Sequence, residues 1–126
     1  TLTRVLKIDA EIPLEFVTEE LWRKLQDFQP FGFGNSEPIF ATRGVAIKDS
    51  RLVGTDGKHL KLRVVPSSTL ASQAYANNPL EAIAFNFGSL YGKLQQNSVV
   101  NIAYSIDRNT WNGNSRIQLK IKDIGF

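Results

Sequence analysis

Residues 55–66 of the chain, TDGKHLKLRVVP, combine a turn signal with a regular alternation of side chains. The Asp-Gly pair at its start is typical of a tight hairpin, and the closing proline ends a strand. Between them, apolar residues take every second position, namely Leu60, Leu62 and Val64. The alternate positions are polar and basic: His59, Lys61 and Arg63. This period of two predicts a strand with one buried face and one basic, solvent-facing face.

The same arrangement recurs near the C-terminus. The turn signal Asn112-Gly113-Asn114 follows a strand at residues 99–108, in which Tyr104 is expected in the core with its hydroxyl near the rim. After the turn, the apolar positions of residues 116–124 are Ile117, Leu119 and Ile121. The outward positions are Arg116, Gln118, Lys120 and Lys122. A second hairpin with a second basic row is therefore predicted.

The remaining elements extend outward from these two hairpins. Further strands are expected at residues 40–53 and 82–87, with a helical turn or two at 89–94. Upstream, residues 5–12 alternate as a strand, and a helix capped by Thr18 runs to about residue 29, before Pro30. The predicted fold class is mainly β: a five-stranded OB-fold (Greek-key) barrel, residues 37–126, preceded by a strand-helix arm and junction loop, residues 1–36. An SH3-like barrel or an open sandwich are the alternatives.

Composition excludes several classes of protein. The 126 residues include no Cys, which excludes disulfides and thiol nucleophiles, and a single His, which excludes multi-histidine metal sites. No apolar run is long enough for a membrane helix, and the first ten residues do not resemble a signal peptide. The chain also has no Met, even at position 1, so it is expected to be a segment of a longer protein.

Charge is distributed unevenly along the chain. Residues 1–42 carry four basic and seven acidic residues, a net charge of −3. Residues 43–92 carry six basic and three acidic residues, and residues 93–126 five and two, so each segment is +3. A basic body behind an acidic start suggests a polyanionic partner, nucleic acid above all, with a merely solvated surface as the alternative.

Motifs for independent catalysis are missing. No Ser lies in a Gly-x-Ser-x-Gly elbow, no pair of carboxylates accompanies the His, and no acidic cluster has metal-ligand spacing. The glycine-rich stretch at residues 30–35 has Glu37 where a dinucleotide fingerprint needs its third Gly, so it is interpreted as structural. We therefore expect a binding domain and not an enzyme.

The stretch FQPFGFGNSEPIF, residues 28–40, resembles the junction motif of the bacterial RecJ family of single-strand-specific DNA exonucleases. The resemblance continues, in the same order, through residues 57–62, 82–85, 100–104, 111–113 and 118–124. Ser36 departs from it, because the family usually has Pro there. The matching part of the family is its OB domain, whereas the Asp-His-His metal ligands of its phosphoesterase motifs have no counterpart.

The resemblance implies a module that binds single-stranded DNA and guides it to the catalytic core of a cytoplasmic 5′–3′ exonuclease of DNA repair and recombination. The Mg or Mn of that core would lie outside this chain, which itself needs no cofactor. Implied partners are the catalytic domains and single-strand-binding protein, with no membrane contact, and the module is expected to be a monomer. The rival hypotheses are a docking module for an acidic tail such as that of single-strand-binding protein, an interdomain scaffold, or an oligosaccharide-binding barrel.

A barrel that holds single strands needs cations for phosphates and aromatic faces for bases. The predicted DNA-contacting residues are Arg43, Lys48, Arg51, Lys58, His59, Lys61, Arg63, Trp111, Arg116, Gln118, Lys120 and Lys122. His59 is expected to donate a hydrogen bond. Trp111, beside the second turn, is expected to be either a stacking platform or a cross-strand anchor. For each cation the alternative is a solvent-facing charge without a ligand.

Overall fold

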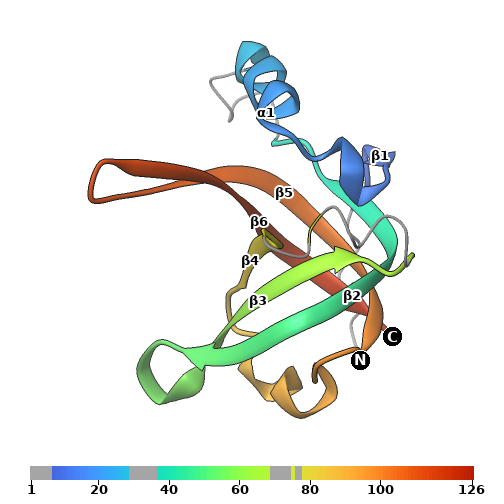
Figure 1. Cartoon of the computed structure of the whole chain (residues 1–126), viewed down its shortest axis with the longest axis vertical. Coiled ribbons are helices and arrows are strands. Elements are labelled where there is room, and N and C mark those ends of the chain that lie inside the picture. The colour runs from blue at the N-terminus through green and yellow to red at the C-terminus, as the bar shows by residue number, and fades with distance from the viewer. Residues whose placement is uncertain (1–6, 29–36, 69–74, 76–77) are drawn as a thin grey trace.

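Five strands pair in a closed ring in the computed structural model, which describes residues 7–28, 37–68, 75 and 78–126 (Figure 1). Around the ring lie β2 (Phe40–Val53), β3 (His59–Pro66), β4 (Leu80–Ala84), β6 (Asn114–Gly125) and β5 (Val99–Trp111), and β5 pairs again with β2. Only β4 and β6 run parallel within this ring. The predicted five-stranded OB-fold barrel is therefore confirmed.

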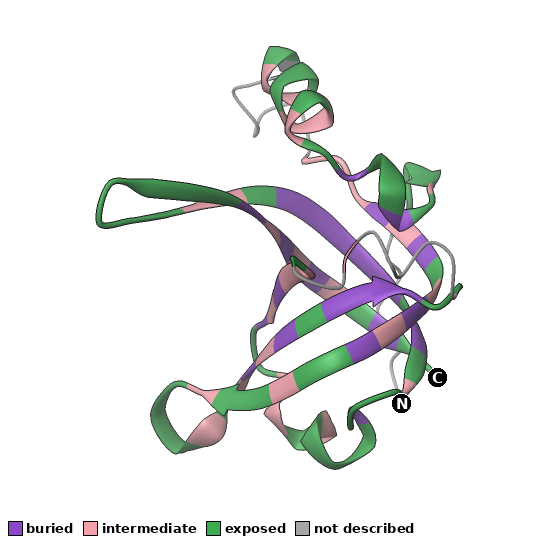
Figure 2. Cartoon of the chain, viewed as in Figure 1, coloured by how far each residue is buried: buried purple, intermediate pink, exposed green. Residues whose placement is uncertain are grey.

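The interior is filled by the alternate apolar positions of the strands (Figure 2). Leu60, Leu62 and Val64 of β3 are each no more than 1% exposed, as the alternation predicts. Opposite them, Ala82 and Ala84 of β4 are completely buried. Small residues suit β4 because it lies between β3 and β6 in a narrow barrel, where larger side chains would collide.

Short helices lie between β4 and β5 and before the first strand of the barrel. The 3-10 helix η4 (Gly88–Lys93) joins β4 to β5, and Leu94 after it is fully buried, which confirms the helical turns expected at residues 89–94. The helix α1 (Glu19–Leu25) begins where it was expected, because the Thr18 hydroxyl accepts a hydrogen bond from the Leu21 N–H at 3.1 Å. A 3-10 turn, η2 (Gln26–Phe28), continues it.

Two expected strands differ in extent. The N-terminal strand, expected over residues 5–12, is only β1 (Ala10–Glu11) within the described residues, followed by the 3-10 turn η1 (Leu14–Phe16). It is short because it pairs only with residues 40–41 of β2, before β3 begins to pair with β2 at Val45. The fourth strand, expected at 82–87, ends at Ala84, because Asn86 takes a left-handed conformation with φ +67°. The glycine-rich loop expected at residues 30–35 lies outside the described residues.

Tyr104 lies in the core, as expected. Its side chain is 0% exposed, and its hydroxyl is 2.7 Å from the Thr42 Oγ1. Thr42 in turn donates to the Ile12 carbonyl at 2.7 Å, so the Tyr104 hydroxyl is the donor of the first bond. This chain of bonds ties the N-terminal segment to the core. Burial raises the pKa of Tyr104 to about 12.

We expect Tyr104→Phe to lower the free energy of unfolding by about 1 kcal/mol at pH 8, because one buried hydrogen bond is lost. Because the folded state keeps Tyr104 protonated up to a higher pH than the unfolded state, its contribution is complete below pH 10 and falls as pH rises towards 12. Urea unfolding at pH 8 and pH 11 should therefore show the wild-type advantage shrinking at the higher pH. The exposed Tyr91 supplies the control, Tyr91→Phe, and a constant difference between wild type and Tyr104→Phe would contradict the assignment.

Candidate nucleic-acid interface

The surface between the two long hairpins is the candidate site. OB-folds bind oligonucleotides across the second and third strands of the barrel, between the loops that join strands one to two and four to five. Here these elements are β3, β4, the loop at residues 54–58 and the turn at 112–113. Figure 1 shows the β2–β3 and β5–β6 hairpins reaching out on the same side of the barrel.

Strand register brings the two predicted basic rows onto one face. Lys61 of β3 is paired with Ile83 of β4, and Ile83 is paired with Lys120 of β6. On its other side Lys61 is paired with Arg51 of β2. Residues paired in this way point to the same face of a sheet. We call Arg51, Lys61, Ile83 and Lys120 the basic strip, since it runs across four strands and contains no acidic residue.

The register row beside the basic strip contains acidic as well as basic residues. It consists of Asp49, Arg63, Glu81, Gln118 and Asp107. Two of the predicted contacts, Arg63 and Gln118, therefore have acidic cross-strand neighbours. Arg51 and Lys61 of the basic strip therefore lie together, and the row that borders them carries acidic residues.

Carboxylates divide the predicted cations into two groups. Arg43 pairs with Glu11 at 2.9 Å, Lys120 with Asp107 at 3.7 Å, and Lys122 with Glu37 at 3.7 Å. The side chains of Lys120 and Lys122 are only 34% and 25% exposed. Within the described residues, no ion pair involves the remaining members, which are Lys48, Arg51, Lys58, Lys61, Arg63 and Arg116.

Two of these unpaired cations line a groove further along β2 and β3. Lys48 and Arg63 border a hollow of about 460 Å³ together with Asp49, Gln95 and Gln96. Lys48 is exposed at the point where the pairing of β2 with β3 shifts register, between Ile47 and Asp49. The bulge turns this part of β2 out of the regular alternation, so Lys48 is separate from the basic strip.

Trp111 lies at the tip of the β5–β6 hairpin. It is 39% exposed, and the Arg116 guanidinium lies 5.8 Å from the centre of its ring. The turn beyond it uses Asn112 and Gly113, both with positive φ, which is the backbone of a two-residue hairpin. The exposed part of the ring has the accessibility that stacking on a base requires, and the contact with Arg116 also joins the two strands of the hairpin.

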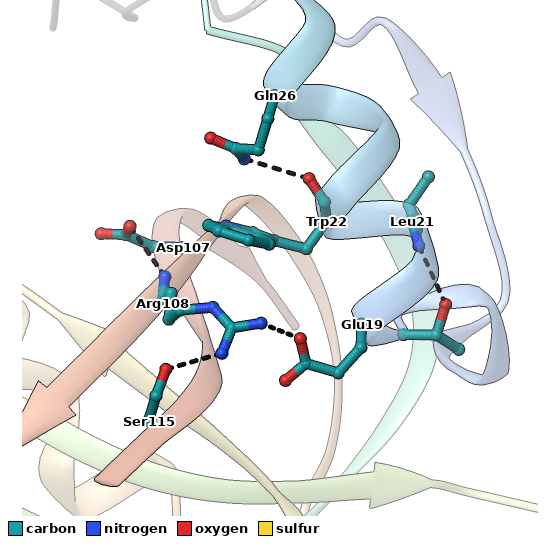
Figure 3. A network of polar contacts seen from close by, with 8 residues as sticks. Glu19, Leu21, Trp22, Gln26, Asp107, Arg108 and Ser115 are labelled. Atoms are coloured by element: carbon teal, nitrogen blue, oxygen red, sulfur yellow. Dashed lines mark hydrogen bonds and ion pairs between the residues drawn. The ribbon is translucent and has the colours of Figure 1, made fainter. Parts of the chain in front are cut away.

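The N-terminal arm is fastened to this hairpin through Arg108 (Figure 3). The Arg108 guanidinium lies 4.2 Å from the centre of the Trp22 ring, forms an ion pair with Glu19 of α1, and donates to the Ser115 hydroxyl at 2.6 Å. Arg108 therefore joins three segments: α1, β5 and β6. The arm covers part of the outer face of β5 and β6, leaving a cavity of about 190 Å³ whose lining includes Trp22, Asp107 and Lys120.

One exposed aromatic residue at the site was not among the predicted contacts. Phe85 follows β4 directly and is 50% exposed, with its ring centre 5.2 Å from that of His59. Phe85 was expected inside a strand over residues 82–87, so its position in a turn was not expected. His59 accepts a hydrogen bond at Nδ1 from the Asn86 N–H at 2.9 Å. The donor role expected of His59 therefore falls to Nε2.

Comparison with known proteins gives a consistent set of relatives. Residues 8–123 match the family model described as RecJ OB domain. Over 119 residues the chain is 26% identical to the single-stranded-DNA-specific exonuclease RecJ of Bacillus subtilis (strain 168), a match that covers 94% of this chain and 14% of that protein. Crystal structures of RecJ from Thermus thermophilus also match. The complex with Mg²⁺ has a TM-score of 0.65 at 23% identity, and the complex with Mn²⁺ has 0.64 at 24%.

This chain matches only a small part of each of the two solved RecJ structures. The matches span 94% and 93% of this chain but 16% and 15% of the two RecJ chains. This chain thus spans about a seventh of the relatives that it matches.

We expect Arg108→Ala to loosen the arm while the barrel stays folded, because the stack on Trp22, the ion pair and the bond to Ser115 are lost together. The free energy of unfolding should fall by about 1–3 kcal/mol, and protease should cut the arm faster. Lys24→Ala is the matched control, since its exposed pair with Glu20 on the same helix contributes at most a few tenths of a kcal/mol. Equal effects of the two substitutions would contradict the anchoring role of Arg108.

Proposed function

Because the chain belongs to the RecJ OB domain family, we propose that it is the single-stranded-DNA-binding module of a RecJ-like 5′–3′ single-strand-specific exonuclease. It would hold the strand across β3 and β4 and lead it towards a catalytic core that is not in this chain. The observation that carries the proposal is the cross-strand pairing of Arg51 with Lys61. Like charges directly opposite one another destabilise a sheet, so folding alone does not favour this pair. A phosphate backbone would relieve the repulsion.

The chemistry of the site favours single strands without sequence preference. Phosphates of the strand would lie along the basic strip and the Lys58 side of the hairpin, and a base would stack on Trp111. Neither kind of contact reads base identity, because every base has a π-face and every nucleotide a phosphate. Each phosphate held by Lys or Arg adds roughly 0.7 to the salt dependence of binding.

Hydrolysis belongs to the rest of the parent enzyme in this proposal. The described residues contain no group of three or more His, Cys, Asp or Glu side chains that could hold a metal ion. The Mg²⁺ or Mn²⁺ of the exonuclease would be bound by its other domains. The proposal places the enzyme in the cytoplasm, in DNA repair and recombination, with this module as a monomeric part of it. No helix of the described residues is long and apolar enough to cross a membrane.

An alternative function is docking of an acidic segment, such as the tail of single-strand-binding protein or a neighbouring domain of the parent. The groove bordered by Lys48 and Arg63 favours it, because both cations lack an ion-pair partner among the described residues and Gln96 adds an amide group to the lining. The two functions differ in where the binding energy arises. An acidic peptide would depend on Lys48 and Arg63, and a nucleic acid on the basic strip and Trp111.

We expect Arg51→Ala combined with Lys61→Ala to weaken binding of a fluorescent single strand of about 20 nucleotides at low salt. The salt slope should fall by about 1.4, two contacts at roughly 0.7 each. The free energy of unfolding should stay the same or rise, because a repulsive cross-strand pair is removed. Fluorescence titration at two salt concentrations and urea unfolding measure the two effects.

The matched control is Arg23→Ala combined with Lys24→Ala, which removes two exposed positive charges on α1, neither of them a predicted DNA contact. It should leave DNA affinity nearly unchanged. An unlabelled duplex and an acidic peptide serve as competitors. Failure of the wild-type chain to bind, or equal affinity of wild type and the Arg51/Lys61 variant, would contradict the proposed function. Displacement by the peptide that depends on Lys48 and Arg63 would support the alternative.

A further inference from the structure

The turn after β4 is packed directly on the β2–β3 hairpin. The Gly88 N–H donates to the Lys58 carbonyl at 2.9 Å. A Cβ at Gly88 would lie 2.1 Å from the Gly57 carbonyl oxygen, so only glycine allows the two backbones this close. This backbone contact holds residues 85–88 against the loop that precedes β3.

His59 is held from three directions at this junction. Its Nδ1 accepts the Asn86 N–H at 2.9 Å, and the Phe85 ring meets it edge to face at 76°. On another side lies the backbone of Gly54, where a Cβ would be 2.6 Å from the His59 Cδ2. The imidazole therefore has little freedom to turn, and it supports one side of Phe85.

Phe85 is left half exposed by these contacts, at 50%. One neighbour along the same face is cationic, because Lys61 pairs with Ile83, two residues before Phe85. Lys58 directly precedes His59 in the chain. Within the described residues, neither lysine has a carboxylate partner. A fixed, exposed aromatic face beside unpaired cations matches a nucleotide in chemistry, with an apolar face for the base and positive charge for the phosphate.

We propose that Phe85, supported by His59, is a base-stacking subsite for one nucleotide of a bound single strand. The inference rests on the proposed function and adds to it a second stacking position, separate from Trp111. Lys61 or Lys58 would neutralise the phosphate of the stacked nucleotide, and the His59 Nε2–H would be free to donate to it or to its sugar. Phe85 carries no hydrogen-bonding group, so the subsite would accept any base.

The test compares wild-type chain with Phe85→Ala and Phe85→Trp on two probes: an oligothymidine of about 15 nucleotides and an abasic strand of the same length. With oligothymidine, Phe85→Ala should bind roughly 5- to 150-fold more weakly, the range for loss of one base–aromatic stack, and Phe85→Trp should bind at least as well as wild type. On the abasic strand, which keeps the phosphates, the three proteins should bind alike. Phe16→Ala, which removes a 61% exposed aromatic ring of the N-terminal arm, is the matched control.

The outcomes separate this inference from the function on which it rests. If wild type binds oligothymidine and Phe85→Ala binds it equally well, the subsite is wrong and the proposed function stands. An equal loss on the abasic strand would also overturn the subsite, because a structural or electrostatic effect would then explain the loss. If wild type binds neither probe at low salt, both proposals fail. Thermal unfolding of each variant confirms that the substitution leaves the fold intact.

Discussion

Closure of the barrel depends on β2, which must form hydrogen bonds along both of its edges. It pairs with β5 over residues 40–46 and with β3 over residues 45–53. A strand that pairs with two neighbours in a closed barrel has to bend. In β2 the register shifts between Thr42 and Val45 against β5, and between Ile47 and Asp49 against β3, and these irregularities allow the bend. Gly44, with φ +68°, lies at the first shift, and its N–H donates to the Asn101 side chain at 3.1 Å. A Cβ there would lie 3.0 Å from the Ser67 hydroxyl, so glycine is the residue that suits this bend.

The surface follows from this closure. With β3, β4 and β6 side by side, side chains far apart in sequence fall into register rows, and one row collects Arg51, Lys61 and Lys120 around Ile83. The adjoining row alternates in sign through Asp49, Arg63 and Glu81. The first row is positive and the second is mixed in charge, and both rows run perpendicular to the strands. A bound polyanion would therefore follow the positive row across the strands and would not run parallel to β3.

Much of the fold could be predicted because its signals are local. A period of two and the Asp-Gly and Asn-Gly turns are read within a few residues, and they predicted both hairpins and both basic rows. Partners distant in sequence could not be read in this way: the ion pair of Lys122 with Glu37 joins two residues that lie 85 positions apart in the chain. Phe85 was missed because the strand was expected to continue to residue 87, whereas Asn86 takes a positive φ and the turn after it packs on the β2–β3 hairpin.

The acidic arm explains why the positive charge is concentrated where it is. Glu11, Glu19 and Glu37, all upstream of the barrel strands, form ion pairs with Arg43, Arg108 and Lys122. These three cations lie on β2, β5 and β6, away from the first hairpin. These three carboxylates therefore neutralise only part of the positive charge of the barrel. They neutralise the side that the arm covers, so that the unpaired cations of the described barrel, Arg51, Lys58 and Lys61 among them, dominate the field at the β3 side of the surface.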